Sequence, residues 1–166
     1  MTKTTKYYLW GIVGFIVVLI GAQMWSSSAA SVEPIASGEL TFSETDWDFG
    51  DISMADGIVT QSIPVENETQ APITITRLET SCMCTTAQVV HEDGSKSGLK
   101  GMVGHGGTPS VSETIEPGET ATLLVNFDPN AHGPSATGAI RRTVSLQTNS
   151  QTQSDVELTF SGMVTK

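Results

Sequence analysis

The sequence after residue 38 is a series of short segments in which apolar and polar residues alternate. Alternation with a period of two is typical of half-buried β-strands, because successive side chains point to opposite faces. Gly, Pro, Asn or Asp residues separate the segments, and no later stretch has the period of an amphipathic helix. The pattern predicts an all-β, antiparallel β-sandwich of about seven strands. The predicted strands are residues 39–42, 46–49, 58–65, 73–78, 120–127, 140–147 and 156–164.

Charge limits what such a domain can bind. The chain has 8 basic and 18 acidic residues, and its formal net charge is −10. Lys3 and Lys6 precede every acidic residue, so the part that begins at Glu33 carries 6 basic against 18 acidic residues and a net charge of −12. This charge repels phosphate backbones, and we therefore expect no nucleic-acid partner.

An uncharged apolar stretch, residues 7–25, predicts a transmembrane helix. About 18 helical residues reach about 27 Å, close to the hydrocarbon thickness of a bilayer. Lys3 and Lys6, in a predicted cytoplasmic segment 1–6, would orient this signal-anchor with its C-terminal end outside. A cleaved signal peptide is the alternative, since Ser28-Ala29-Ala30 offers small residues to a signal peptidase. In both cases we expect the domain to be extracytoplasmic, and the anchor makes a single-pass protein of the bacterial cytoplasmic membrane.

The rest of the chain divides into a tether and one domain. Residues 26–38 are small and polar and predict a flexible linker, and residues 39–166 predict the globular domain. Within that domain, residues 90–112 form a long Gly-rich segment without clear periodicity. Loops of this length tend to carry function, and this one follows the cysteines directly.

Cys82 and Cys84 are the only cysteines. In an extended strand their Cα atoms would lie roughly 6.5–7 Å apart, at the upper end of disulfide geometry, so a disulfide requires a turn or bulge. Free thiols outside the cytoplasm tend to oxidise. Three interpretations remain open: a buried or disulfide-bonded structural pair, a metal site, and a redox-active dithiol.

Other soft ligands occur near the cysteines in the sequence. Met102 and His105 lie in the Gly-rich segment, and His132 lies in a later predicted loop. Thiolate, thioether and imidazole ligands suit copper(I), and thiolate with imidazole suits zinc. The predicted metal ligands are therefore Cys82, Cys84, Met102, His105 and His132. Packing of residues 101–106 against the cysteines would favour this interpretation.

Several short motifs occur in an order that resembles one bacterial family. They are residues 48–52 (DFGDI), 65–67 (VEN), 81–85 (SCMCT), 115–119 (IEPGE), 125–128 (VNFD) and 148–150 (TNS) with Ser161-Gly162. The sequence from about residue 40 to residue 164 is similar to domain-of-unknown-function family 1573. The resemblance implies an immunoglobulin-like sandwich, of the kind found in major-sperm-protein domains, and an extracytoplasmic location. It implies no reaction. The family usually has glycine between its cysteines, where this chain has Met83.

Other residues carry weaker signals. Trp47 and Phe49 alternate with acidic residues and are expected in the core, with a sugar-binding platform as the alternative. We expect His91 to be exposed to solvent, and Arg141-Arg142 to lie at the rim with local salt links.

The sequence thus predicts a non-enzymatic, membrane-tethered interaction module that pairs with envelope proteins by strand addition. It has no GxSxG, HExxH or P-loop motif. The alternative function is a soft-metal binding or thiol-redox protein of the envelope. A thioredoxin-like role is disfavoured, because no βαβ pattern surrounds the cysteines.

Overall fold

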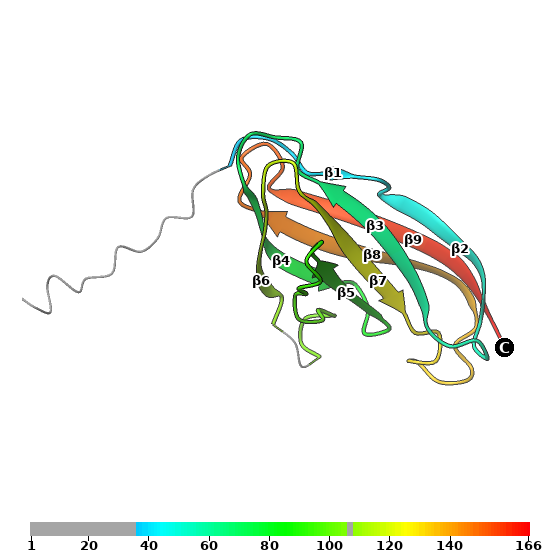
Figure 1. The fold of residues 1–166 in the computed structure, drawn as a ribbon. Helices are drawn as coiled ribbons and strands as arrows, with labels where there is room; N and C mark the ends of the chain where they lie inside the picture. Colours follow the sequence, from blue (N-terminus) through cyan, green and yellow to red (C-terminus); the bar gives the residue numbers. More distant parts are fainter. Residues whose placement is uncertain (1–35, 106–107) are drawn as a thin grey trace, which may run out of the picture. The chain divides into compact units, whose positions relative to one another are not determined.

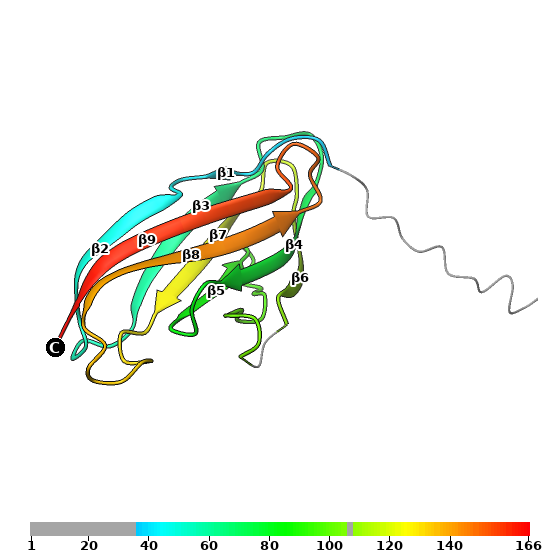
Figure 2. The same cartoon turned by 180° about the vertical axis from the view of Figure 1, so that it is seen from behind.

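The computed structural model describes residues 36–105 and 108–166 as a sandwich of two β-sheets (Figures 1 and 2). One sheet has the strand order β1-β3-β7-β5 and the other the order β2-β9-β8-β4-β6. The strands are β1 (Thr41–Phe42), β2 (Asp46–Ser53), β3 (Val59–Glu66), β4 (Ile73–Thr80), β5 (Thr85–Val90), β6 (Ser110–Ile115), β7 (Thr120–Phe127), β8 (Gly138–Thr148) and β9 (Asp155–Thr165). The all-β sandwich is therefore confirmed.

The described residues form nine strands, not about seven. All seven predicted segments are found, and the two additional strands, β5 and β6, flank the Gly-rich segment. β5 has a weak signal because its buried positions are Thr85, Ala87 and Val89, which are small or only moderately apolar. β6 is an edge strand that buries only Ile115.

The sandwich is also not antiparallel throughout, because β2 runs parallel to β9. The register between them shifts at a bulge between Asp48 and Asp51. Gly50 lies in this bulge with φ 67°, a conformation that side chains disfavour. A Cβ on Gly162 would lie 2.6 Å from Ile52 Cδ1 and 3.3 Å from the carbonyl oxygen of Gly50, so a larger residue there would require the buried Ile52 side chain to shift.

The core lies between the two sheets. β7 shows the pattern most clearly, because Ala121, Leu123, Val125 and Phe127 are buried and alternate with partly exposed residues. At one end of the core, Phe160 stacks on Trp47 with ring centroids 5.3 Å apart and contacts the edges of neighbouring rings. Trp47 is buried, and Phe49 packs against the core, so the expected placement of both rings is confirmed and the sugar platform is excluded.

The predicted signal-anchor and most of the predicted linker lie outside the described residues. In the described part of the chain, no helix is long and apolar enough to cross a membrane. The sandwich begins at Ala36, which is buried and forms an isolated bridge with Ser150.

Candidate functional site

The two cysteines lie in the turn that joins β4 to β5 and so crosses from one sheet to the other. The backbone N–H of Thr85 donates to the carbonyl of Cys82 at 3.1 Å, which closes a four-residue turn. This turn brings the two Cα atoms to 5.3 Å, well inside the distance for an extended strand, and the cysteines form a disulfide. No described non-glycine residue has positive φ, so Met83 is accommodated where the family usually has glycine.

Hydrogen bonds hold this cysteine turn, residues 80–85, from several sides. The buried Thr80 hydroxyl lies 3.1 Å from the carbonyl oxygen of Cys82 and 2.9 Å from that of Thr85. The Ser81 N–H donates to the carbonyl of Thr143 on β8, and the Thr143 N–H donates to the Ser81 hydroxyl, both at 2.9 Å. The positions of the sulfurs are thus set by backbone contacts to neighbouring elements.

A second crossover, the loop between β7 and β8, lies at the same end of the sandwich (Figures 1 and 2). The N–H of Asp128, at the start of this loop, donates to the carbonyl of Cys84 at 2.8 Å. The Asp128 side chain accepts from the N–H of Asn130, and Gly133 turns the chain with φ 83°. His132 lies between these two turns, and its Nε2 atom is 3.1 Å from Cys82 Sγ.

Each sulfur therefore has a nitrogen-bearing neighbour. Cys82 is partly exposed and faces His132, whereas Cys84 is 3% exposed and accepts a hydrogen bond from Arg142 Nε at 3.3 Å. The guanidinium is always charged, so it would stabilise negative charge on the Cys84 sulfur if the disulfide were reduced. Arg141 and Arg142 were both expected at the rim with local salt links. Arg141 meets this expectation, because it pairs with Asp46 at 3.1 Å. Arg142 does not, because its side chain contacts Cys84 instead. Nothing in the sequence indicates that this arginine lies beside a cysteine.

The structure brings together three of the five predicted metal ligands. The ligand atoms of Cys82, Cys84 and His132 all lie within 4.8 Å of one another. Met102 and His105 instead line a surface cavity of about 380 Å³, together with Met83, Thr86, Leu99, Lys100 and Gly101.

The Gly-rich segment does not extend into solvent at its start. It folds back along β5, where Lys100 and Ala87 exchange two backbone hydrogen bonds of 2.8 Å. Gly101 then contacts the cysteine turn, since its carbonyl accepts from the Thr80 N–H at 3.4 Å. Gly106 lies outside the described residues.

His91 is not solvent-exposed as predicted, because its side chain is 13% exposed and lies between two carboxylates. Nδ1 is 2.8 Å from Glu119, and Nε2 is 3.1 Å from Glu113. Burial alone would lower the pKa of His91, but hydrogen bonds and charges from Glu119 and Glu113 outweigh it and raise the pKa above the ordinary 6.5. The backbone N–H of Glu116, together with His91, lowers the pKa of Glu119.

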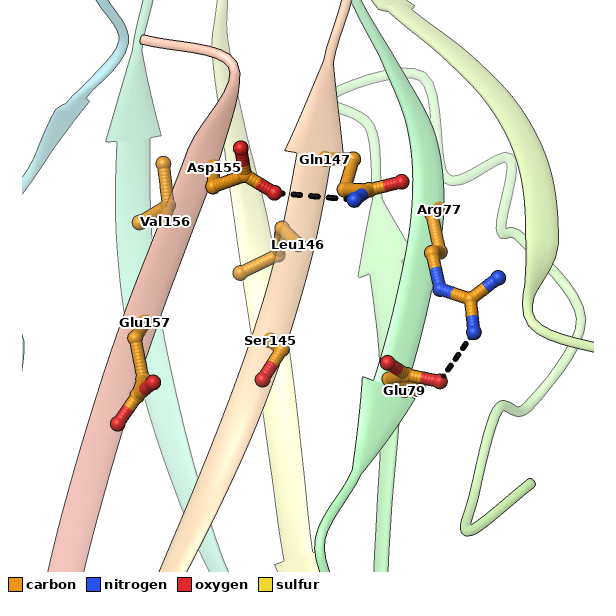
Figure 3. A pocket seen from close by; sticks show the side chains of 8 residues that line it. All are labelled: Arg77, Glu79, Ser145, Leu146, Gln147, Asp155, Val156 and Glu157. Atoms are coloured by element: carbon orange, nitrogen blue, oxygen red, sulfur yellow. Dashed lines mark hydrogen bonds and ion pairs between the residues drawn. The ribbon is translucent and has the colours of Figure 1, made fainter.

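The outer face of the five-stranded sheet carries a surface cavity of about 300 Å³ on β4, β8 and β9 (Figure 3). Its polar side chains pair with their neighbours: Arg77 binds Glu79 at 2.7 Å, and Gln147 donates to Asp155 at 2.9 Å. Short-range pairs of this kind are ordinary on the solvated face of a sheet, and we assign no function to this cavity.

Comparison with known families agrees with the motifs. Residues 40–104 match the model of the family described as protein of unknown function DUF1573. The resemblance to DUF1573 is confirmed. The matched part contains the cysteine turn and ends before His132 and Arg142, so the neighbours of the sulfurs lie outside the DUF1573 match. No curated protein matches the sequence significantly.

A solved structure agrees with the fold. A protein of unknown function from Porphyromonas gingivalis W83 aligns with a TM-score of 0.56 and 16% identity, over 80% of this chain and 50% of that one. The chain thus spans half the length of that protein. The PapD-like domain 7 of human CEP192 aligns with a TM-score of 0.48 and 13% identity, over 84% of this chain and 96% of that one. At 16% identity the likeness to the Porphyromonas gingivalis protein concerns the fold alone.

The His91 cluster predicts that stability depends on pH. The folded-state pKa of His91 lies above 6.5, so the protonated ring stabilises the fold fully below about pH 6.5, and this contribution is lost as the pH rises through the folded-state pKa. We expect His91→Gln to lower the free energy of unfolding by about 1 kcal/mol near pH 5.5 and by less near pH 8.5. Urea denaturation at both values measures this, with His105→Gln as the exposed control. An equal loss at both pH values would contradict the assignment.

Proposed function

We propose that this chain is a membrane-tethered envelope domain that works through a thiol–disulfide centre at Cys82 and Cys84. One observation carries the proposal: the partly exposed sulfur faces a histidine ring nitrogen, and the buried sulfur faces an arginine. A pair that served only as a structural staple would need neither neighbour. A cationic, hydrogen-bonding environment is typical of reactive cysteines, because the thiolate is the form that takes part in exchange.

The exposures of the two sulfurs assign their roles. A thiolate of a partner dithiol attacks Cys82 Sγ, the S–S bond breaks, and Cys84 leaves as a thiolate beside Arg142. The second partner thiolate then attacks the partner sulfur of the mixed disulfide and releases Cys82 as a thiolate beside His132. The pair gains two electrons, and the partner becomes a disulfide. The reverse sequence oxidises the pair.

This proposal includes the interaction function expected from the sequence, because the exchange needs a protein partner in the envelope. Strands β1, β2 and β5 lie at sheet edges, and so does β6, the edge strand next to β4. However, Ser110, Ser112, Glu113 and Thr114 make most of that strand polar, and Glu113 is already bound to His91. A partner strand would make few apolar contacts with β6, so we favour the thiol–disulfide function over strand addition.

The proposed membrane tether and the proposed extracytoplasmic location both depend on the predicted signal-anchor in residues 1–25. An extracytoplasmic location supports the proposal, because disulfides form and persist there. We expect the chain to stay with the membrane pellet after an alkaline carbonate wash and to keep its N-terminal residues. An exported, soluble form that begins after Ala30 would instead support the cleaved signal peptide. A chain that is washed off with its N-terminus intact would contradict both forms of export.

The redox proposal predicts how the reduction potential responds to mutation. Arg142→Gln removes the cation beside Cys84 and so destabilises the reduced form by about 1 kcal/mol, which lowers the potential by about 20 mV for two electrons. Equilibration with glutathione buffers, followed by thiol alkylation and mass measurement, gives the potential.

Arg141→Gln is the matched control, because Arg141 pairs with the exposed Asp46 and not with a sulfur. Its potential should equal that of the wild type. If both variants leave the potential unchanged, or if the pair is reduced only when the chain unfolds, the thiol–disulfide function is wrong.

A further inference from the structure

The reduced cysteine pair creates a ligand set that the disulfide does not offer. Three ligand atoms, from Cys82, Cys84 and His132, lie within 4.8 Å of one another. An ion about 2.0–2.3 Å from sulfur and nitrogen ligands holds them about 3.5–4 Å apart in a trigonal site. The sulfurs separate when the S–S bond is broken, so small side-chain movements bring all three atoms to these distances.

We infer that the reduced pair and His132 bind one copper(I) ion, and that oxidation of the pair releases it. This inference rests on the proposed thiol–disulfide function, because only the reduced pair offers two thiolates. Two thiolates and one imidazole form a soft ligand set, which among the common ions suits copper(I) and zinc. Among the described residues, no aspartate or glutamate joins the group, so the site lacks the oxygen ligands of harder ions.

The charge beside the site distinguishes copper(I) from zinc. Two thiolates and Cu⁺ leave one negative charge, which Arg142 balances from its position 3.3 Å from Cys84 Sγ. Two thiolates and Zn²⁺ are already neutral, so the same arginine would stabilise the zinc complex less than the copper(I) complex. Zinc also takes four ligands in structural sites, whereas the described residues supply three here.

The backbone preorganises these ligands. Cys84 and the loop that carries His132 are joined by the hydrogen bond from Asp128 N–H to the Cys84 carbonyl, and the cysteine turn is tied to β8 through Ser81. Because both crossovers are fixed before the metal binds, the site needs little ordering of the chain.

Release follows from the same chemistry. A disulfide partner accepts two electrons from the two thiolates, Cys82 and Cys84 join again, and the partner becomes a dithiol. Copper remains in the +1 state and loses two of its three ligands. The affinity for copper(I) is therefore controlled by the redox state of the pair.

The test uses the full chain in detergent, reduced with a phosphine under anaerobic conditions and freed of reductant. Thiols are counted first, and copper(I) is then titrated in competition with a chromogenic copper(I) chelator. We expect two thiols and one tightly bound copper per reduced chain, and no tight binding to the oxidised chain. His132→Asn should weaken binding at least tenfold, and X-ray absorption should show two sulfur ligands and one nitrogen ligand.

His105→Asn and Met102→Leu are the matched controls, since these residues line the neighbouring cavity, and we expect both to bind copper like the wild type. Two thiols without copper binding would overturn the inference and leave the thiol–disulfide function standing. Failure to obtain two thiols in the folded chain would overturn that function itself. Copper binding that does not depend on His132, or a preference for zinc, would overturn the assigned site.

Discussion

The apolar layer between the two sheets fixes the distance between the chain segments that cross from one sheet to the other. β4 and β5 belong to different sheets, as do β7 and β8. The cysteine turn and the His132 loop are thus both crossovers at one end of the sandwich, and their separation follows from the packing of the sheets. Buried side chains such as Val125 and Phe160 therefore help to position the site through the packing of the sheets.

The sequence predicts the architecture well because most strands show the period-two alternation of apolar and polar residues. β7, which buries apolar residues at alternate positions, is predicted with the bounds that the structure shows, and the other predicted strands differ at one or both ends. The small buried residues of β5 and the polar residues of the edge strand β6 do not form this pattern, so these two strands are not predicted. The parallel pairing of β2 with β9 joins the two ends of the domain, and neither segment carries a local signal for its direction.

Only part of the site can be predicted from the sequence, because contacts between residues far apart in the chain leave no local pattern. The cysteines are recognised by type and spacing, and His132 by type alone. Met102 and His105 look equally suitable along the chain, but the Gly-rich segment returns along β5 and leads them to a separate cavity. Arg142 and His91 receive their roles from residues far away in sequence, Cys84 and Glu113 with Glu119, which only the folded sheets bring near.

A disulfide between residues two apart has little use as a staple. Its closed loop is so short that the chain-entropy estimate gives about 1.5 kcal/mol, while the sandwich has a continuous core of its own. We therefore propose, as the central claim, that the fold is stable without the disulfide and that the disulfide is available for exchange with a partner dithiol. The most direct measurement is the free energy of unfolding of the oxidised and reduced chains in urea. The account predicts one cooperative transition in both, with a loss of less than about 2 kcal/mol on reduction. Unfolding on reduction, or a loss above about 4 kcal/mol, would show that the pair is structural and would contradict the account.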